Sequence, residues 1–233
     1  FRVYNSNERI DAGARNSYFH NNLGGYHGAK LKRYQELMDM QIAKGNSSVI
    51  DMLNTKYIIR KSSSGAMLAL KNPSQLGAAW FVNSAKVVNN ADDEMTALST
   101  FNPSSEVLID KRYNLEQRSY NATGSILLSS YKPNHLVYDV TAEDESFAVF
   151  SEIFYGKGWN AYVDGVLKDH YRVNYVLRGM PLPKGAYSVE FKFEPQSVAL
   201  GSSIALVCSI LIYLLLASMF YFSINNRKRS TFN

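Results

Sequence analysis

The chain has 233 residues, enough for one large domain or two small ones with cores of their own. Its formal net charge is +5, but Arg227, Lys228 and Arg229 carry three of its 25 basic residues, which leaves 22 basic against 20 acidic residues in the rest. This near balance excludes the basic surface of a nucleic-acid-binding protein, so we expect no nucleic-acid partner.

The cysteine content and the start of the chain set two further limits. The single cysteine, Cys208, cannot form a disulfide framework, so the fold must depend on its core. The residues that follow Phe1 lack the charged and apolar regions of a signal peptide. We therefore interpret the sequence as a piece of a longer chain.

Residues 1–115 are predicted to form a small α+β unit. Apolar residues recur at helical spacing from Lys30 to Lys44, which indicates a helix with one buried face. Ser48 with Asp51 resembles a capping box at the start of a second helix. The patterns also predict strands at 57–59, 79–88 and 106–109, and a helix at 92–100.

Residues 116–196 are predicted to form an antiparallel β-sandwich, because short strands are separated by turn residues at regular spacing. Alternation of apolar and polar residues from Tyr187 to Phe193 indicates one buried and one exposed face. The predicted strands are 125–131, 135–141, 147–154, 160–163, 176–180 and 187–193.

The segment from Val198 to Ile224 contains 27 residues without a charge, more than the roughly 20 that cross a bilayer core. A buried core helix is the alternative, but the basic cluster at 227–229 favours a membrane span. By the positive-inside rule, the C-terminus is cytoplasmic and residues 1–197 are extracytoplasmic. We assign residues 197–225 to one transmembrane helix and 226–233 to a cytoplasmic basic tail.

Within this span, Gly201, Ala205 and Ser209 recur every four residues. Small residues at this spacing let another helix approach closely. We therefore expect the bilayer and further transmembrane helices of the parent protein as partners of the span.

The stretch GGYHGAK, residues 24–30, precedes the predicted helix and invites comparison with a phosphate-binding loop. It lacks the spacing of a nucleotide loop and the hydroxyl residue after the lysine. A weaker hypothesis is that Tyr26, His27, Lys30 and Arg33 hold the phosphate of a lipid-linked substrate near the helix N-terminus. The alternative is a structural glycine turn.

The stretch FYGKGWNAYVDG, residues 154–165, is the second candidate binding segment. Trp159 and Tyr162 could offer aromatic faces to a sugar ring. The alternative is that these rings belong to the core of the sandwich.

Other chemistry has weaker support in the sequence. The four histidines lack metal-ligand spacing, and no nucleophile elbow is present, so we predict no metal, no cofactor and no identifiable catalytic residue. The acidic cluster Asp92, Asp93 and Glu94 is interpreted as a solvated helix start. Glu143, Asp144 and Glu145 are interpreted as a solvated turn.

The order of several motifs resembles the C-terminal region of the YfhO family of bacterial multispanning membrane proteins. The matching stretches are YFHNNLGGYHGAKLKRYQELMD at 18–39, MLNTKYII at 52–59, NPSQLGAAWFV at 72–82, FYGKGWNAYVDG at 154–165 and VNYVLRGMPLPKGAYSVEFKFEP at 173–195, followed by the terminal span. The resemblance covers nearly the whole chain.

This resemblance implies a parent built like C-type glycosyltransferases, in the bacterial inner membrane. Such an enzyme transfers a sugar from a polyprenyl-phosphate carrier to a cell-envelope glycan. The catalytic acidic residue of these enzymes lies in an early outer loop, so no catalytic residue is carried over to this chain. The alternatives are a non-catalytic, membrane-anchored module that binds envelope glycan, or the scaffold domain of a transporter or assembly factor.

Overall fold

The computed structural model describes the backbone of residues 1–230 and the side chains of residues 1–222. Two compact units are present. The first comprises Phe1–Gly156 and Asn160–Lys192, and the second comprises Lys157–Trp159 and the chain from Phe193.

A three-stranded sheet and four short helical segments form the N-terminal part of the first unit. The sheet has the order β1 (Arg2–Asn5), β2 (Thr55–Lys61), β3 (Met67–Lys71), with β1 parallel and β3 antiparallel to β2. The helical segments are α1 (Arg15–Phe19), α2 (Lys32–Leu37), the π-helix η1 (Met38–Ile42) and α3 (Ser47–Met52). The predicted α+β character of this part is confirmed.

The helix predicted from Lys30 to Lys44 is present but changes its hydrogen-bond pattern halfway, from α2 to the π-helix η1. Leu37, Met38 and Ile42 are buried along it, as the apolar spacing predicted. The predicted capping box at Ser48 is wrong. Asn46 caps α3 instead, because its side-chain oxygen accepts a hydrogen bond from the Val49 N–H at 3.3 Å.

A seven-stranded sheet forms the centre of the first unit. Its order is β4 (Ala79–Val82), β10 (Ser146–Ile153), β14 (Leu177–Leu182), β13 (Tyr171–Val173), β6 (Glu106–Asp110), β5 (Ser84–Val88), β7 (Arg118–Ser119). The helix α4 (Ala91–Ala97) connects the parallel pair β5 and β6, and the 3-10 helix η2 (Lys111–Tyr113) follows β6. The sheet thus takes strands from both sides of residue 115, where the domain boundary is predicted.

The single strand predicted at 79–88 is wrong. Asn83 separates β4 from β5, and its backbone N–H donates to the Ser105 carbonyl at 2.8 Å. The two halves then pair with different strands, β4 with β10 and β5 with β6. A local apolar pattern could not reveal this, because each half reads as a buried strand by itself.

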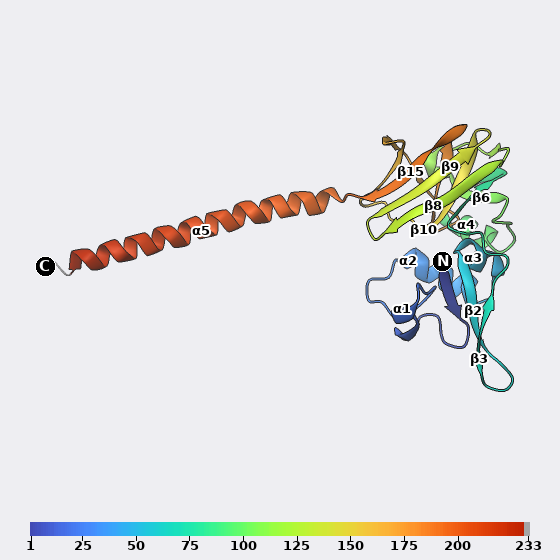
Figure 1. Ribbon diagram of the computed structural model, residues 1–233, viewed down its shortest axis with the longest axis horizontal. Coiled ribbons are helices and arrows are strands. Elements are labelled where there is room, and N and C mark those ends of the chain that lie inside the picture. The colour runs from blue at the N-terminus through green and yellow to red at the C-terminus, as the bar shows by residue number, and fades with distance from the viewer. Residues whose placement is uncertain (231–233) are drawn as a thin grey trace. The chain divides into compact units, whose positions relative to one another are not determined.

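The five-stranded sheet has the order β12 (Val166–Lys168), β11 (Trp159–Val163), β15 (Gly185–Phe193), β9 (His135–Ala142), β8 (Gly124–Lys132). In Figure 1, β8, β9 and β15 run side by side. Aromatic rings link this sheet to the seven-stranded one: Phe150 of β10 lies 4.9 Å from Tyr138 and 4.9 Å from Phe191, measured between ring centroids. The antiparallel strands predicted after residue 116 are therefore shared between two sheets.

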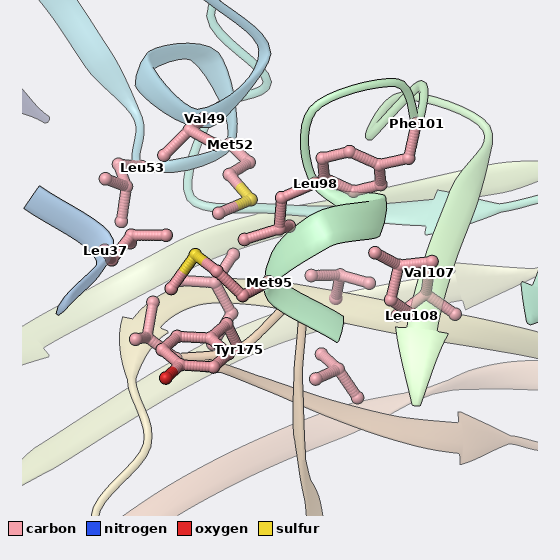
Figure 2. Packing of buried hydrophobic residues seen from close by; sticks show 14 of the residues in the cluster. Leu37, Val49, Met52, Leu53, Met95, Leu98, Phe101, Val107, Leu108 and Tyr175 are labelled. Atoms are coloured by element: carbon pink, nitrogen blue, oxygen red, sulfur yellow. The ribbon is translucent and has the colours of Figure 1, made fainter. Parts of the chain in front are cut away.

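A hydrophobic cluster joins the helical segments to the seven-stranded sheet. Figure 2 shows Met95 of α4 and the following Leu98 between the leucines of the N-terminal helical part, Leu37 and Leu53, and the β6 residues Val107 and Leu108. Burial of these side chains supplies the main stabilising free energy of the unit.

The second unit contains the helix α5 (Gln196–Ser230), of which Gln196–Phe222 is long and apolar enough to cross a membrane. The backbone remains helical beyond residue 225, so α5 continues past the predicted end of the transmembrane segment. Residues 231–233 of the predicted basic tail lie outside the described residues. Among residues 1–222 this is the one candidate span, and it matches the predicted single C-terminal apolar helix.

Replacing Phe150 by alanine is expected to lower the free energy of unfolding by about 3–5 kcal/mol, because its fully buried ring contacts both sheets. Phe19→Ala is the matched control, since its side chain is 67 % exposed, and it is expected to cost less than about 0.5 kcal/mol. Denaturant titration followed by tryptophan fluorescence measures both. Equal losses in the two variants would contradict this packing.

Candidate functional site

The backbone geometry of the GGYHGAK turn requires glycine at its first two positions. Gly25 has a φ of +121°, and its N–H donates to the Ile10 carbonyl at 2.6 Å. At Gly24, an added Cβ would collide with the Ile10 backbone. Both glycines are thus required for the close approach of the turn to the loop around Ile10, whereas Gly28 has open space around it.

Tyr26, His27 and Lys30 lie on the surface part of this turn. Tyr26 is 76 % exposed, and the Ala29 N–H donates to His27 Nδ1 at 3.1 Å. Lys30 Nζ donates to Gln35 Oε1 at 3.0 Å. Within the side chains that the structure describes, no hydrogen bond or ring contact joins these three residues to one another.

The Arg33 side chain contacts Glu94 and Tyr175, unlike the side chains of Tyr26, His27 and Lys30. Its Nη1 lies 3.5 Å from Glu94 Oε2, and its guanidinium lies 4.5 Å from the centre of the Tyr175 ring. The Arg33 charge is therefore balanced by a carboxylate and rests on an aromatic face.

Glu94 is fully buried, so its interpretation as part of a solvated acidic cluster is wrong, while Asp92 and Asp93 are exposed as predicted. Glu94 Oε1 accepts a hydrogen bond from the Tyr175 N–H at 2.8 Å. Burial raises the pKa of Glu94 to about 7, against the smaller opposing effects of this hydrogen bond and of the charges on Arg172 and Arg33.

The loop at 174–175 presents the Tyr175 N–H to this carboxylate through an unusual backbone. Asn174 and Tyr175 have φ values of 46° and 72°, a left-handed conformation that costs free energy in residues with a side chain. The Asn174 side chain accepts from the Leu108 N–H at 2.8 Å, and the Tyr175 hydroxyl donates to Glu36 Oε2 at 2.6 Å. These contacts hold the loop in place.

We call Arg33, Glu36, Glu94, Asn174 and Tyr175 the clamp network. It connects α2 to α4 and to the loop between β13 and β14. Burial, followed by the bond to Glu36, raises the pKa of Tyr175 to about 12. The network therefore fixes the helix that follows the GGYHGAK turn relative to the seven-stranded sheet.

Trp159 and Tyr162, the predicted sugar-contacting residues, both lie in β11 and contact side chains of their own unit. The Trp159 ring lies 5.3 Å from the Phe193 ring, and the Lys192 ammonium lies 4.9 Å from the centre of the Tyr162 ring.

A separate polar pocket of about 340 Å³ lies in the first unit. Its lining includes Arg2, His20, Asn21, Asn22, Tyr131 and Glu152. Arg2 Nη1 donates to the carbonyls of Leu53 and Ser151, both at 2.8 Å, and Arg2 Nη2 lies 3.7 Å from Glu152 Oε2. We call this set of residues the polar pocket.

The sequence offered partial signals for the residues that were missed. Glu94 shares a helix face with Met95 and Leu98, and this spacing could have indicated its burial. Asn174 and Tyr175 lie in the stretch 173–195 that was matched to the family. No pattern in the sequence indicated that their φ values are positive. The polar pocket joins residues up to 150 positions apart, which no local pattern reveals.

Three sheets and one apolar helix of membrane-spanning length fit the class of membrane proteins that carry a folded domain. The family model described as Bacterial membrane protein YfhO matches residues 110–205, from the end of β6 into α5. This match supports membership of the chain in the YfhO family, as the motifs predicted. No curated protein and no solved structure matches the chain.

The buried Glu94 makes stability depend on pH. Because its folded-state pKa of about 7 exceeds the ordinary value of 4.5, the folded state binds the proton more tightly than the unfolded state. The contribution of Glu94 to the free energy of unfolding is therefore expected to be fully present below pH 4.5 and to fall by up to about 3 kcal/mol as the pH rises to 7.

Glu94→Gln is expected to remove this step, since glutamine keeps an acceptor for the Tyr175 N–H without a charge. Asp93→Asn is the control, because Asp93 is exposed on the same helix, and it should keep the step. Denaturant titrations at several pH values measure the effect. An unchanged pH dependence in Glu94→Gln would show that Glu94 is not its source.

Proposed function

We propose that this chain is the C-terminal extracytoplasmic part, with the last transmembrane helix, of a bacterial inner-membrane glycosyltransferase. The parent would transfer a sugar from a polyprenyl-phosphate carrier to a cell-envelope acceptor. The observation that carries this proposal is the match of residues 110–205, from the end of β6 into the apolar helix, to a family of bacterial membrane proteins. That family is glycosyltransferase-like, so a domain beside the membrane would meet lipid-linked sugar and envelope glycan.

Along the chain, only Glu194 and Pro195 separate β15 from α5. With the basic residues Arg227, Lys228 and Arg229 on the cytoplasmic side, residues 1–197 would lie outside the cytoplasm. This arrangement would place the domain at the membrane surface on the side where polyprenyl-phosphate sugars are used.

The surface part of the GGYHGAK turn is the proposed contact for the carrier phosphate. Lys30 supplies a positive charge and His27 a ring nitrogen, and both side chains reach the exposed turn. Arg33 would act indirectly, because it is engaged in the clamp network and orients the following helix.

A second candidate function is a membrane-anchored module that binds envelope glycan without catalysis. The polar pocket favours it, since a cavity of about 340 Å³ lined by amide, carboxylate and tyrosine side chains suits a sugar. The two functions differ in one property. A transferase loses sugar transfer when the carrier-phosphate contacts are removed, whereas a glycan-binding module has no transfer to lose.

The variant His27→Ala with Lys30→Ala in the parent protein is expected to lower sugar transfer by at least about tenfold, since a bond to a charged group is worth about 1.5–3 kcal/mol. Transfer of a radiolabelled sugar from polyprenyl phosphate to envelope polymer measures it. Lys132→Ala, which removes an exposed lysine of β8, is the control and should transfer normally. Normal transfer by the double variant at normal protein level would exclude the phosphate contact.

The proposed orientation can be tested with single cysteines. In a Cys208→Ala background, Ser129→Cys is expected to react with a membrane-impermeant maleimide in intact cells, because Ser129 lies in the exposed part of β8. Ser230→Cys should react only after the membrane is permeabilised. The reverse labelling pattern would place the domain in the cytoplasm and contradict the proposed function.

A further inference from the structure

Main-chain hydrogen bonds hold the backbone of one wall of the polar pocket, while several of its polar side chains make no hydrogen bond within residues 1–222. The Val3 N–H donates to the Asn21 carbonyl at 2.8 Å, and the Leu23 N–H donates to the Val3 carbonyl at 3.0 Å. The segment of His20, Asn21 and Asn22 is thus held against β1 by its main chain. Its side chains remain available for a ligand without reorganisation of the backbone, which lowers the entropic cost of binding.

Several hydrogen-bonding groups of this pocket are unused. Among the side chains of residues 1–222, those of His20, Asn21, Asn22 and Tyr131 make no hydrogen bond, and Glu152 Oε1 has no partner. Tyr131 and Glu152 both line the pocket, and the charge of Glu152 raises the pKa of Tyr131. The pocket therefore offers both donors and acceptors.

The side-chain charges of the pocket balance; the other charge at its lining is the α-ammonium of Phe1, which is present only where the chain begins at that residue. Arg2 and Glu152 are its only lining residues with a permanently charged side chain in the described part of the chain, and they form an ion pair at 3.7 Å. Arg2 is also committed to two backbone carbonyls. A phosphate group needs a surplus of positive charge, so this balance favours a neutral ligand over an anionic one.

We infer that the polar pocket binds a neutral sugar unit of the acceptor glycan. The amides of Asn21 and Asn22 and the carboxylate of Glu152 would bond the hydroxyls, and the 57 % exposed ring of Tyr131 would cover one face of the sugar. The volume of about 340 Å³ lies in the range of roughly 300–1,000 Å³ for small-molecule sites.

The assignment to the acceptor rests on the proposed function, whereas the binding of a neutral sugar does not. The pocket shares no residue with the basic turn at Tyr26, His27 and Lys30, which is proposed to contact the carrier phosphate. Donor and acceptor would therefore be recognised by different chemistry on one domain.

The test is a saturation-transfer NMR titration of the full chain in detergent with D-glucose, D-galactose and N-acetyl-D-glucosamine, and separately with inorganic phosphate. At least one sugar is expected to bind. Tyr131→Ala and Asn21→Ala are each expected to weaken it by at least about fivefold. Tyr18→Ala is the matched control, because this tyrosine is 84 % exposed and does not line the pocket. It should bind as the wild type does.

Three results would overturn the inference: no sugar binding by the wild type, equal binding by Tyr131→Ala and the wild type, or preferential binding of phosphate in the pocket. Thermal unfolding of each variant checks that it is folded, and Asn21→Ala provides a second probe if Tyr131→Ala unfolds. Sugar binding without transfer by the parent protein would instead reject the proposed function and leave the pocket assignment standing.

Discussion

The burial of the Glu94 carboxylate is the constraint on which the arrangement of the first unit depends. A buried carboxylate is unfavourable unless partners compensate it, and here the Tyr175 N–H and Arg33, from two other segments, do so only in part, because burial still raises the pKa of Glu94 to about 7. Both partners must be in place at once. The left-handed backbone at Asn174 and Tyr175 is therefore tolerated, because relaxing it would withdraw the N–H from Glu94.

This network explains how a small α+β part and two large sheets behave as one compact unit. Met95 and Leu98 anchor α4 in the shared hydrophobic cluster, and Glu94 on the same helix fixes its rotation through directional bonds. Hydrophobic contacts alone are non-directional and would permit small rotations. The hydrogen bonds supply the specificity that the apolar contacts lack.

Sequence patterns predicted most of the antiparallel strands, because alternation and turn residues act over a few neighbouring positions. They also predicted the terminal apolar helix and the buried face of α2 and η1. They failed where the pairing between distant strands determines the strand boundaries. At Asn83 one apolar run divides into two strands, and these pair with different partners. They also failed at Glu94, where an acidic first turn fits the helix dipole whether the side chain is exposed or buried.

The same limits explain why one candidate binding region could be predicted from the sequence and the other could not. The turn with His27 and Lys30 is contiguous, so its glycines and charges stand out in the sequence. The polar pocket joins Arg2, Asn21, Tyr131 and Glu152 from separate elements, and only the fold brings them together. An ion pair of Arg2 and Glu152 leaves the side chains of that pocket neutral, while in the turn the Lys30 ammonium is hydrogen-bonded to an amide and has no ion pair among the side chains of residues 1–222. This difference in charge separates a surface suited to a phosphate from a cavity suited to a neutral sugar.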